Sequence, residues 1–170
     1  IQVANETISL LHSIHAEPDH DWGLDHGAWT VVRHMYPEAN VPVLQLSIDY
    51  SKAPQYHYDL AKDLYSLRKK GVLIIGSGNM VHNLRMVAWD RLNEPEYGFD
   101  WAYELNDKFK QLIADGNHQA LINFSTISPD ISKAIPTSEH YLPLLYNLGL
   151  QGKNEEVSFF NDKAVGGSLT

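Results

Sequence analysis

Three histidines lie where the chain passes between loop and regular structure: His26 in LDHGAW, His82 in GNMVHNLR and His140 in PTSEHYLP. Each has apolar or small residues beside it rather than a run of charges. Imidazole titrates near neutral pH, so it can exchange protons with a substrate or bind a metal ion. The pattern indicates acid–base chemistry or a histidine-based metal site, although any one such histidine alone is more often a packed polar residue.

The absence of cysteine narrows the choice of metal ligands. A transition-metal site in this chain needs histidine and carboxylate ligands, because no thiolate is available. His20 is a weaker candidate, whereas His12, His34, His57 and His118 lie in mixed helical surroundings typical of surface or packed histidines. The sequence lacks the HExxH spacing that indicates a metal site by itself.

The segment GSGNMVHNLR, residues 76–85, allows other interpretations. Its glycines could cradle a phosphate, but neither the P-loop lysine nor the GxGxxG spacing is present. Ser77 is a weak nucleophile candidate, since no G-x-S-x-G pattern surrounds it. Small residues after a strand could also let a substrate approach the backbone, with His82 beside it.

Composition excludes several classes of protein. The chain has 170 residues, 44% of them hydrophobic, and a formal net charge of −8. A charge of this sign argues against nucleic-acid binding, and no apolar run is long enough to span a bilayer. The expected class is a cytoplasmic globular protein with one domain over residues 1–170.

The elements that must position these histidines alternate between strand and helix. Apolar runs predict strands at Val41–Ile48, Val72–Gly76 and residues 156–160, and apolar spacing predicts a helix over residues 56–70. A strand–helix–strand unit predicts an α/β fold with a mostly parallel central sheet flanked by helices. His82 then follows a strand at the carboxyl edge of the sheet, where such folds bind ligands.

Two further helices bear on the site. The spacing predicts a helix over residues 100–116 with Asp100 as N-cap and Gly116 as its stop. Pro143 is tolerated only in a first turn, so the helix that includes YLPLLYNLG should begin near residues 137–139. This would place His140 at a helix N-terminus.

Four motifs together carry a resemblance to a known family: GLDHGAW, VPVLQLSID, GSGNMVHNLR and PTSEHYLPLLYNLG. In this order and at these separations they resemble class III extradiol ring-cleaving dioxygenases of the LigB-like superfamily, DOPA 4,5-dioxygenase type. The resemblance covers nearly the whole chain. Two histidine motifs of the family's N-terminal part, SHG-like and SAHW-like, do not occur here, and the chain resembles the C-terminal two-thirds. We therefore expect a catalytic domain that lacks its N-terminal part and is incomplete at both ends.

The resemblance assigns roles to the histidines. His140 matches a metal ligand, with Glu139 as the alternative ligand. His82 matches an active-site histidine that faces the substrate and also counts as a metal ligand in zinc-containing members. His26 matches a second active-site histidine. The implied sites are therefore His82 and His26 for catalysis and His140 and His82 for one divalent metal.

The implied reaction is the opening of a catechol ring, DOPA-like, with O₂ on Fe(II), or with Zn(II) as the bound metal. A histidine near the metal would take the catechol proton and later return one. The expected partners are a small aromatic diol and O₂, and homo-oligomerisation stays open. Two alternatives remain: a zinc-binding protein of the same fold without oxygenase activity, and a non-enzymatic α/β domain. Because two ligands would lie outside it, we expect the isolated 170-residue chain to be inactive and poorly soluble.

Overall fold

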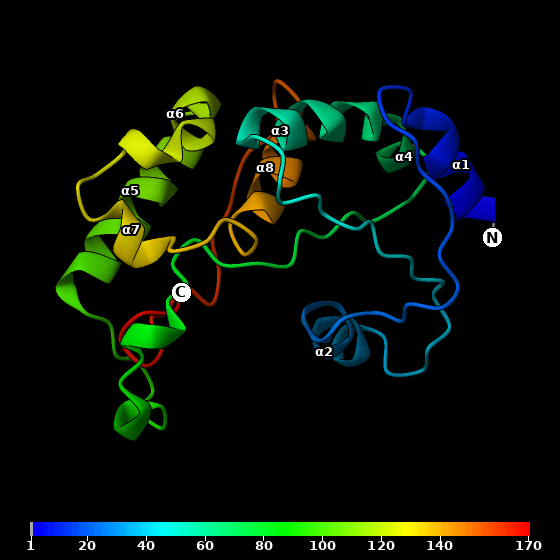
Figure 1. The fold of residues 1–170 in the computed structure, drawn as a ribbon. Helices are drawn as coiled ribbons and strands as arrows, with labels where there is room; N and C mark the ends of the chain where they lie inside the picture. Colours follow the sequence, from blue (N-terminus) through cyan, green and yellow to red (C-terminus); the bar gives the residue numbers. More distant parts are fainter. Residues whose placement is uncertain (1) are drawn as a thin grey trace.

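The computed structural model describes residues 2–170, and its regular elements are helices (Figure 1). The α-helices are α1 Gln2–Leu10, α2 His26–Met35, α3 Pro54–Asp63, α4 Tyr65–Arg68, α5 Asp100–Ala114, α6 His118–Ile122, α7 Ile131–Ala134 and α8 Leu142–Gly149. Short 3₁₀ helices are η1 Leu84–Met86, η2 Trp89–Arg91 and η3 Phe124–Thr126. No helix in this described part is long and apolar enough to cross a membrane.

The main core lies among α5, α6, α7 and α8. Helix α5 buries Leu105, Phe109 and Leu112, which share one face because they are three and four positions apart. Tyr141 and Leu145 pack into the same cluster. The apolar positions that repeat at helical spacing in the sequence are thus the ones that α5 buries in the core.

A second core joins α3 to α8. Leu60 and Ala61 of α3 pack with Tyr146 of α8, and Gly149 approaches α3 so closely that a Cβ there would clash with the Tyr58 carbonyl oxygen. Figure 1 shows the two helices side by side at the top of the molecule. Helix α8 therefore belongs to both cores and connects them.

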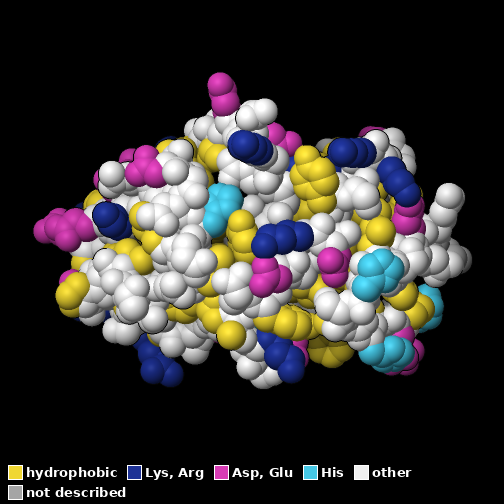
Figure 2. All heavy atoms as spheres, turned by 90° about the horizontal axis from the view of Figure 1, so that it is seen from above, with side chains coloured by type: hydrophobic (Ala, Val, Ile, Leu, Met, Phe, Trp, Pro, Cys, Tyr) yellow, Lys and Arg dark blue, Asp and Glu magenta, His cyan; other side chains and the backbone are white. Residues whose placement is uncertain are grey.

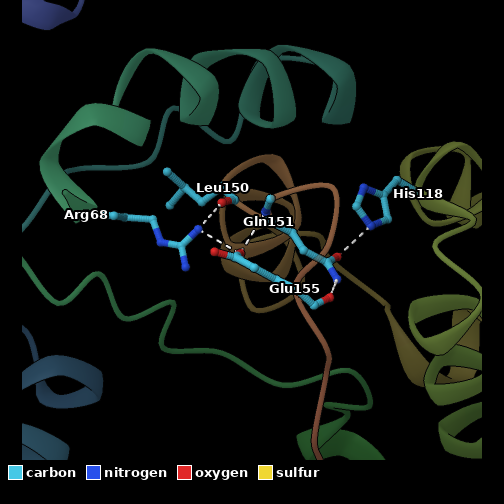
Figure 3. Close-up of polar contacts among 6 residues, drawn as sticks. Arg68, His118, Leu150, Gln151 and Glu155 are labelled. Atoms are coloured by element: carbon cyan, nitrogen blue, oxygen red, sulfur yellow. Dashed lines mark hydrogen bonds and ion pairs between the residues drawn. The ribbon is translucent and has the colours of Figure 1, made fainter.

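Polar contacts fix the C-terminal end of α8 (Figure 3). The Arg68 guanidinium donates to the Leu150 carbonyl oxygen and to the Glu155 carboxylate. The side-chain carbonyl of Gln151 lies 2.9 Å from His118 Nε2, and its amide donates to the Glu155 carbonyl oxygen over 3.1 Å. These bonds tie α4, α6 and the segment after α8 together.

The predicted strands run as extended chain without ladder pairing. Residues 41–48, 72–76 and 156–160 lie outside helices, and no backbone hydrogen bond joins these segments in the described part of the chain. Val72 and Ile74 pack towards the second core while Leu73 and Ile75 are exposed, so the alternation of a strand is present. The helical part of the predicted α/β fold is confirmed, but the mostly parallel sheet is not: between residues 2 and 170 the β-bridges are isolated ones.

Helix boundaries differ from the prediction in three places. The predicted helix over 56–70 is divided at Leu64, whose N–H bonds three residues back to Ala61 rather than four. Helix α5 does begin at Asp100, but Phe99 is its N-cap and Asp100 makes no side-chain cap. The predicted start of α8 near residues 137–139 is wrong, because the helix begins at Leu142. Before it, the Ser138 carbonyl oxygen accepts from the N–H groups of Tyr141 and Leu142 and closes a separate turn.

Candidate active site

The clearest feature of the site is the contact between His82 and His140. Their ring centroids lie 3.7 Å apart and their planes are inclined by 19°, so the imidazoles stack. His82 precedes η1, and His140 lies two residues before α8 rather than at its N-terminus. Two histidines far apart in the sequence thus meet at one point.

The loop over residues 77–79 brings them together. Asn79 N–H donates to the His140 carbonyl oxygen over 2.8 Å, and a Cβ on Gly78 would clash with that same oxygen. A Cβ on Gly76 would likewise clash with the Pro143 carbonyl oxygen. The small residues therefore admit the backbone that carries His140, where the sequence had indicated room for a substrate.

The same loop also contacts the residue that follows His26. Ser77 Oγ donates to the Gly27 carbonyl oxygen over 2.8 Å, which joins the loop to the first turn of α2. Helix α2 stands apart from the helical core in Figure 1, with no buried residue, and His26 is exposed. That His26 lies within about 10 Å of the other two rings, a rough reach for groups sharing one site, stays a prediction.

The neighbours of the three histidines have structural roles. Asp25 does not orient His26; its carboxylate is the N-cap of α2, accepting from Ala28 N–H over 2.8 Å, and it also bonds to Gln45. The Ser77 hydroxyl holds the loop through its bond to the Gly27 carbonyl oxygen. The Glu139 carboxylate accepts from the Thr137 hydroxyl over 2.7 Å.

The surroundings shift two pKa values at the site. Burial lowers the pKa of His82, the positive charge of a protonated His140 lowers it further, and Glu139 opposes both. Burial raises the pKa of the Glu139 carboxyl, but the Thr137 hydroxyl and the two imidazoles outweigh it, and the pKa is lowered. Neutral His82 beside ionised Glu139 is therefore the favoured state near neutral pH.

The stack limits what the two rings can bind together. A metal ion lies in the plane of the imidazole that ligates it, about 2.0–2.1 Å from the nitrogen for zinc. Because the two ring centroids are 3.7 Å apart and the planes are nearly parallel, the planes do not meet that close to a nitrogen of either stacked ring. One ion can be ligated by His140 or by His82 in this arrangement, and joint ligation, as the family resemblance implies, requires one ring to rotate.

Few of the described side chains are placed to hold the implied metal. No cluster of three or more histidine, aspartate or glutamate side chains that could hold a metal occurs among residues 2–170. His140, with Glu139 next to it, fits the role of one ligand. The implied metal therefore fits these residues only in part, and no chemical step is derived through it below.

An apolar groove lies elsewhere on the molecule. A groove of about 430 Å³ runs beside α8 and is bordered by Ile74, Leu148, Val157 and Phe159. It does not include the stacked histidines. The apolar groove therefore lies beside the extended segments and not beside the candidate catalytic histidines.

Sequence reasoning missed the residues that hold His82 in place. Asn79 donates to the Thr170 carbonyl oxygen, Asn83 to the Lys133 carbonyl oxygen and Ser168 to the Asn83 carbonyl oxygen. Two of them, Asn79 and Asn83, are polar residues within three positions of His82. That local polarity was the available signal. Ser168 gave none, because its role depends on the chain returning to His82.

Comparisons with known proteins identify the family to which this chain belongs. Residues 2–166 match the family model described as the catalytic LigB subunit of aromatic ring-opening dioxygenase. The crystal structure of an uncharacterized protein from Escherichia coli K12 superposes with a TM-score of 0.83 at 32% identity, covering 98% of this chain and 69% of that one. The fold is therefore that of the LigB group, and the chain belongs to the LigB family.

Curated relatives have more specific names. The 4,5-DOPA dioxygenase extradiol of Escherichia coli K12 is 37% identical over 99% of this chain and 62% of its own length. The protein of the same name from Mirabilis jalapa is 37% identical over 85% of this chain and 53% of its own length. The chain thus spans between about half and two-thirds of the length of these relatives.

Proposed function

We propose that this chain is part of a metal-dependent extradiol dioxygenase that opens the ring of a catechol, DOPA-like, with O₂. The observation that carries the proposal is the His82–His140 stack, in a chain that matches the LigB family over residues 2–166. The metal, Fe(II) for activity or Zn(II) as bound, would polarise the diol and bring it together with O₂. In this proposal His140 is a metal ligand and His82 is the residue that takes a proton from the substrate hydroxyl.

The division of roles follows from the stack. If His140 ligates the ion, His82 lies against its ring face, and an imidazole nitrogen of His82 is free to exchange a proton with a bound diol. The Gly78 loop fixes the His140 backbone. His26 at the start of α2, next to the loop contact at Gly27, is proposed as the second catalytic histidine, which would contact the substrate.

We also propose that residues 1–170 form part of one α/β catalytic domain. In the intact protein the extended segments 41–48, 72–76 and 156–160 would be strands of its mostly parallel sheet. The alternating exposure of residues 72–76 supports this, as does the greater length of the relatives. A cytoplasmic location, the lack of nucleic-acid and membrane partners, and any homo-oligomer remain predictions.

The test uses the full-length protein, loaded with Fe(II) without air and then mixed with DOPA and air. Ring opening produces a yellow compound, whose absorbance measures turnover. We expect His82→Gln to abolish most turnover, and the matched control His34→Gln, which alters an exposed histidine of α2, to keep it. Bound metal without ring opening by the wild type would favour the zinc-binding alternative, and no bound metal would favour the non-enzymatic one.

Metal content separates the histidine roles. We expect His140→Ala to lose metal, because it removes one of few ligands, and His26→Ala to retain metal but lose turnover. Equal metal loss in both variants would contradict the assignment of His26.

A further inference from the structure

The backbone around His82 is bonded on two sides. His82 N–H donates to the Ala134 carbonyl oxygen over 2.8 Å, which joins it to the end of α7. On the other side, Thr170 N–H donates to the Val81 carbonyl oxygen over 3.0 Å, and His82 forms an antiparallel bridge with Leu169. The position of the imidazole therefore depends on two segments distant in the sequence.

Asn83 connects these bonds. It is 6% exposed, and each of its polar groups has a partner. The side-chain N–H donates to the Lys133 carbonyl oxygen over 2.8 Å, and the side-chain oxygen accepts from Arg85 N–H over 3.1 Å. The main-chain N–H donates to the Ser168 carbonyl oxygen over 3.1 Å, and the main-chain oxygen accepts from Ser168 Oγ over 2.8 Å.

The bond to Lys133 has a direct consequence for the stack. Lys133 precedes Ala134, the acceptor for His82, and the chain then continues to His140. The Asn83 amide thus crosslinks the segment that carries one ring to the segment that leads to the other. Removing the amide leaves the Lys133 carbonyl oxygen, which is in a partly buried hydrogen bond, without this donor, and this favours separation of the two segments.

We propose that Asn83 is a positioning residue whose side-chain N–H holds the His82 ring against His140. The inference rests on the proposed function only for its effect on turnover, because the ring contact itself can be measured without metal or substrate. Loss of a residue that orients a site of this kind lowers activity about 10–100-fold.

The test compares two buried asparagines. Asn83→Asp is nearly isosteric and keeps the acceptor for Arg85, but it loses the donor to Lys133. Asn83→Ala removes both. Asn106→Ala is the matched control: Asn106 is 5% exposed on α5, and its amide donates to Asp162 over 3.0 Å, with no contact to the histidines.

The first readout is the NOE between the ring protons of His82 and His140 in ¹³C-histidine-labelled full-length protein, free of metal and substrate. His82→Gln and His140→Gln assign the signals. We expect the NOE in the wild type and in Asn106→Ala, and its loss in both Asn83 variants at temperatures well below unfolding. An NOE of wild-type intensity in Asn83→Asp, or none in the wild type, would overturn the proposal.

The second readout is steady-state kinetics with Fe(II) and DOPA. We expect Asn83→Asp to lower kcat about 10–100-fold with little change in KM, and Asn106→Ala to keep the wild-type kcat. If the NOE is lost in Asn83→Asp while kcat is unchanged, the positioning role of Asn83 is supported, but the role proposed for His82 in turnover fails. If Asn83→Ala does not fold, Asn83→Asp decides the question.

Discussion

The helical core and the extended segments are both rich in apolar residues, but the two regions differ in how far these side chains are exposed to solvent. In the helical core Phe109, Leu121 and Leu145 are fully buried. In the extended segments Leu73 is 60% exposed and Phe160 81% exposed, and hydrophobic side chains also reach the surface between the charged ones in Figure 2.

The difference has a simple physical origin. A helix satisfies its backbone hydrogen bonds within one segment, whereas a strand needs neighbours for its N–H and C=O groups. Each helix therefore needs only one apolar face covered, while each extended segment needs lateral partners too. The candidate site lies at the junction, since His82 follows an extended segment and His140 precedes α8.

Hydrogen exchange gives the largest contrast between the two regions. We expect the inner amides of α5 in this chain to open only with free energies near that of global unfolding, about 5 kcal/mol or more. Amides of residues 73–78 and 156–163, which have no backbone acceptor, should exchange with almost no protection. Slow exchange at Leu73 or Phe159 in the 170-residue chain would show that these segments are paired. Slow exchange only in the full-length protein would support the proposed sheet.

A matched pair of phenylalanines tests burial. Phe109→Ala removes a fully buried ring that contacts Tyr141, and we expect the free energy of unfolding to fall by about 3–5 kcal/mol. Phe160→Ala should change it by about 0.5 kcal/mol or less. Urea denaturation of both variants measures the difference, and comparable losses would contradict the contrast between the regions.

A pair of tyrosines isolates one buried hydrogen bond. The Tyr141 hydroxyl donates to the Leu121 carbonyl oxygen over 2.9 Å, so Tyr141→Phe should lower the free energy of unfolding by about 1 kcal/mol. Tyr50, which is 72% exposed, serves as control, and Tyr50→Phe should have no measurable effect. If the two variants had the same free energy of unfolding, the Tyr141 hydroxyl would not contribute to the stability of the core.

The smallest expected effect is the dependence of the free energy of unfolding on pH that is due to His57. This side chain is buried between α3 and α8, and its Nδ1 lies 3.1 Å from the Tyr146 hydroxyl. Burial lowers the pKa of His57 below the ordinary 6.5, against smaller opposing effects of the Lys52 and Asp49 backbone and the Asp49 charge. The unfolded chain therefore binds this proton more readily, and stability should decrease as pH falls below about 6.5.

Urea denaturation between pH 5 and 8 measures that slope. We expect His57→Gln to have a shallower slope than the wild type, and His15→Gln, at an exposed position, to retain the full slope. A slope unchanged in His57→Gln would mean that other groups produce it.

The sequence by itself determined the helical faces, the extended segments and the identity of the candidate histidines. Spacing of three and four residues was sufficient for α5, because a helix depends on residues close in the chain. The apolar run at residues 72–76 indicated an extended segment, but because Val72 to Ile75 are all apolar it did not indicate which side would face the core. It could not indicate pairing, since pairing depends on what lies beside a strand.

Only the tertiary structure decided how His82 meets His140. Bonds from Asn79, Asn83 and Ser168 join segments that are far apart in the chain around the two rings. The start of α8 also depended on the Ser138 turn rather than on Pro143 alone. Local preferences determine which secondary structure each segment can form. Contacts between distant segments determine the position of each ring, because such contacts form only after the segments have come together.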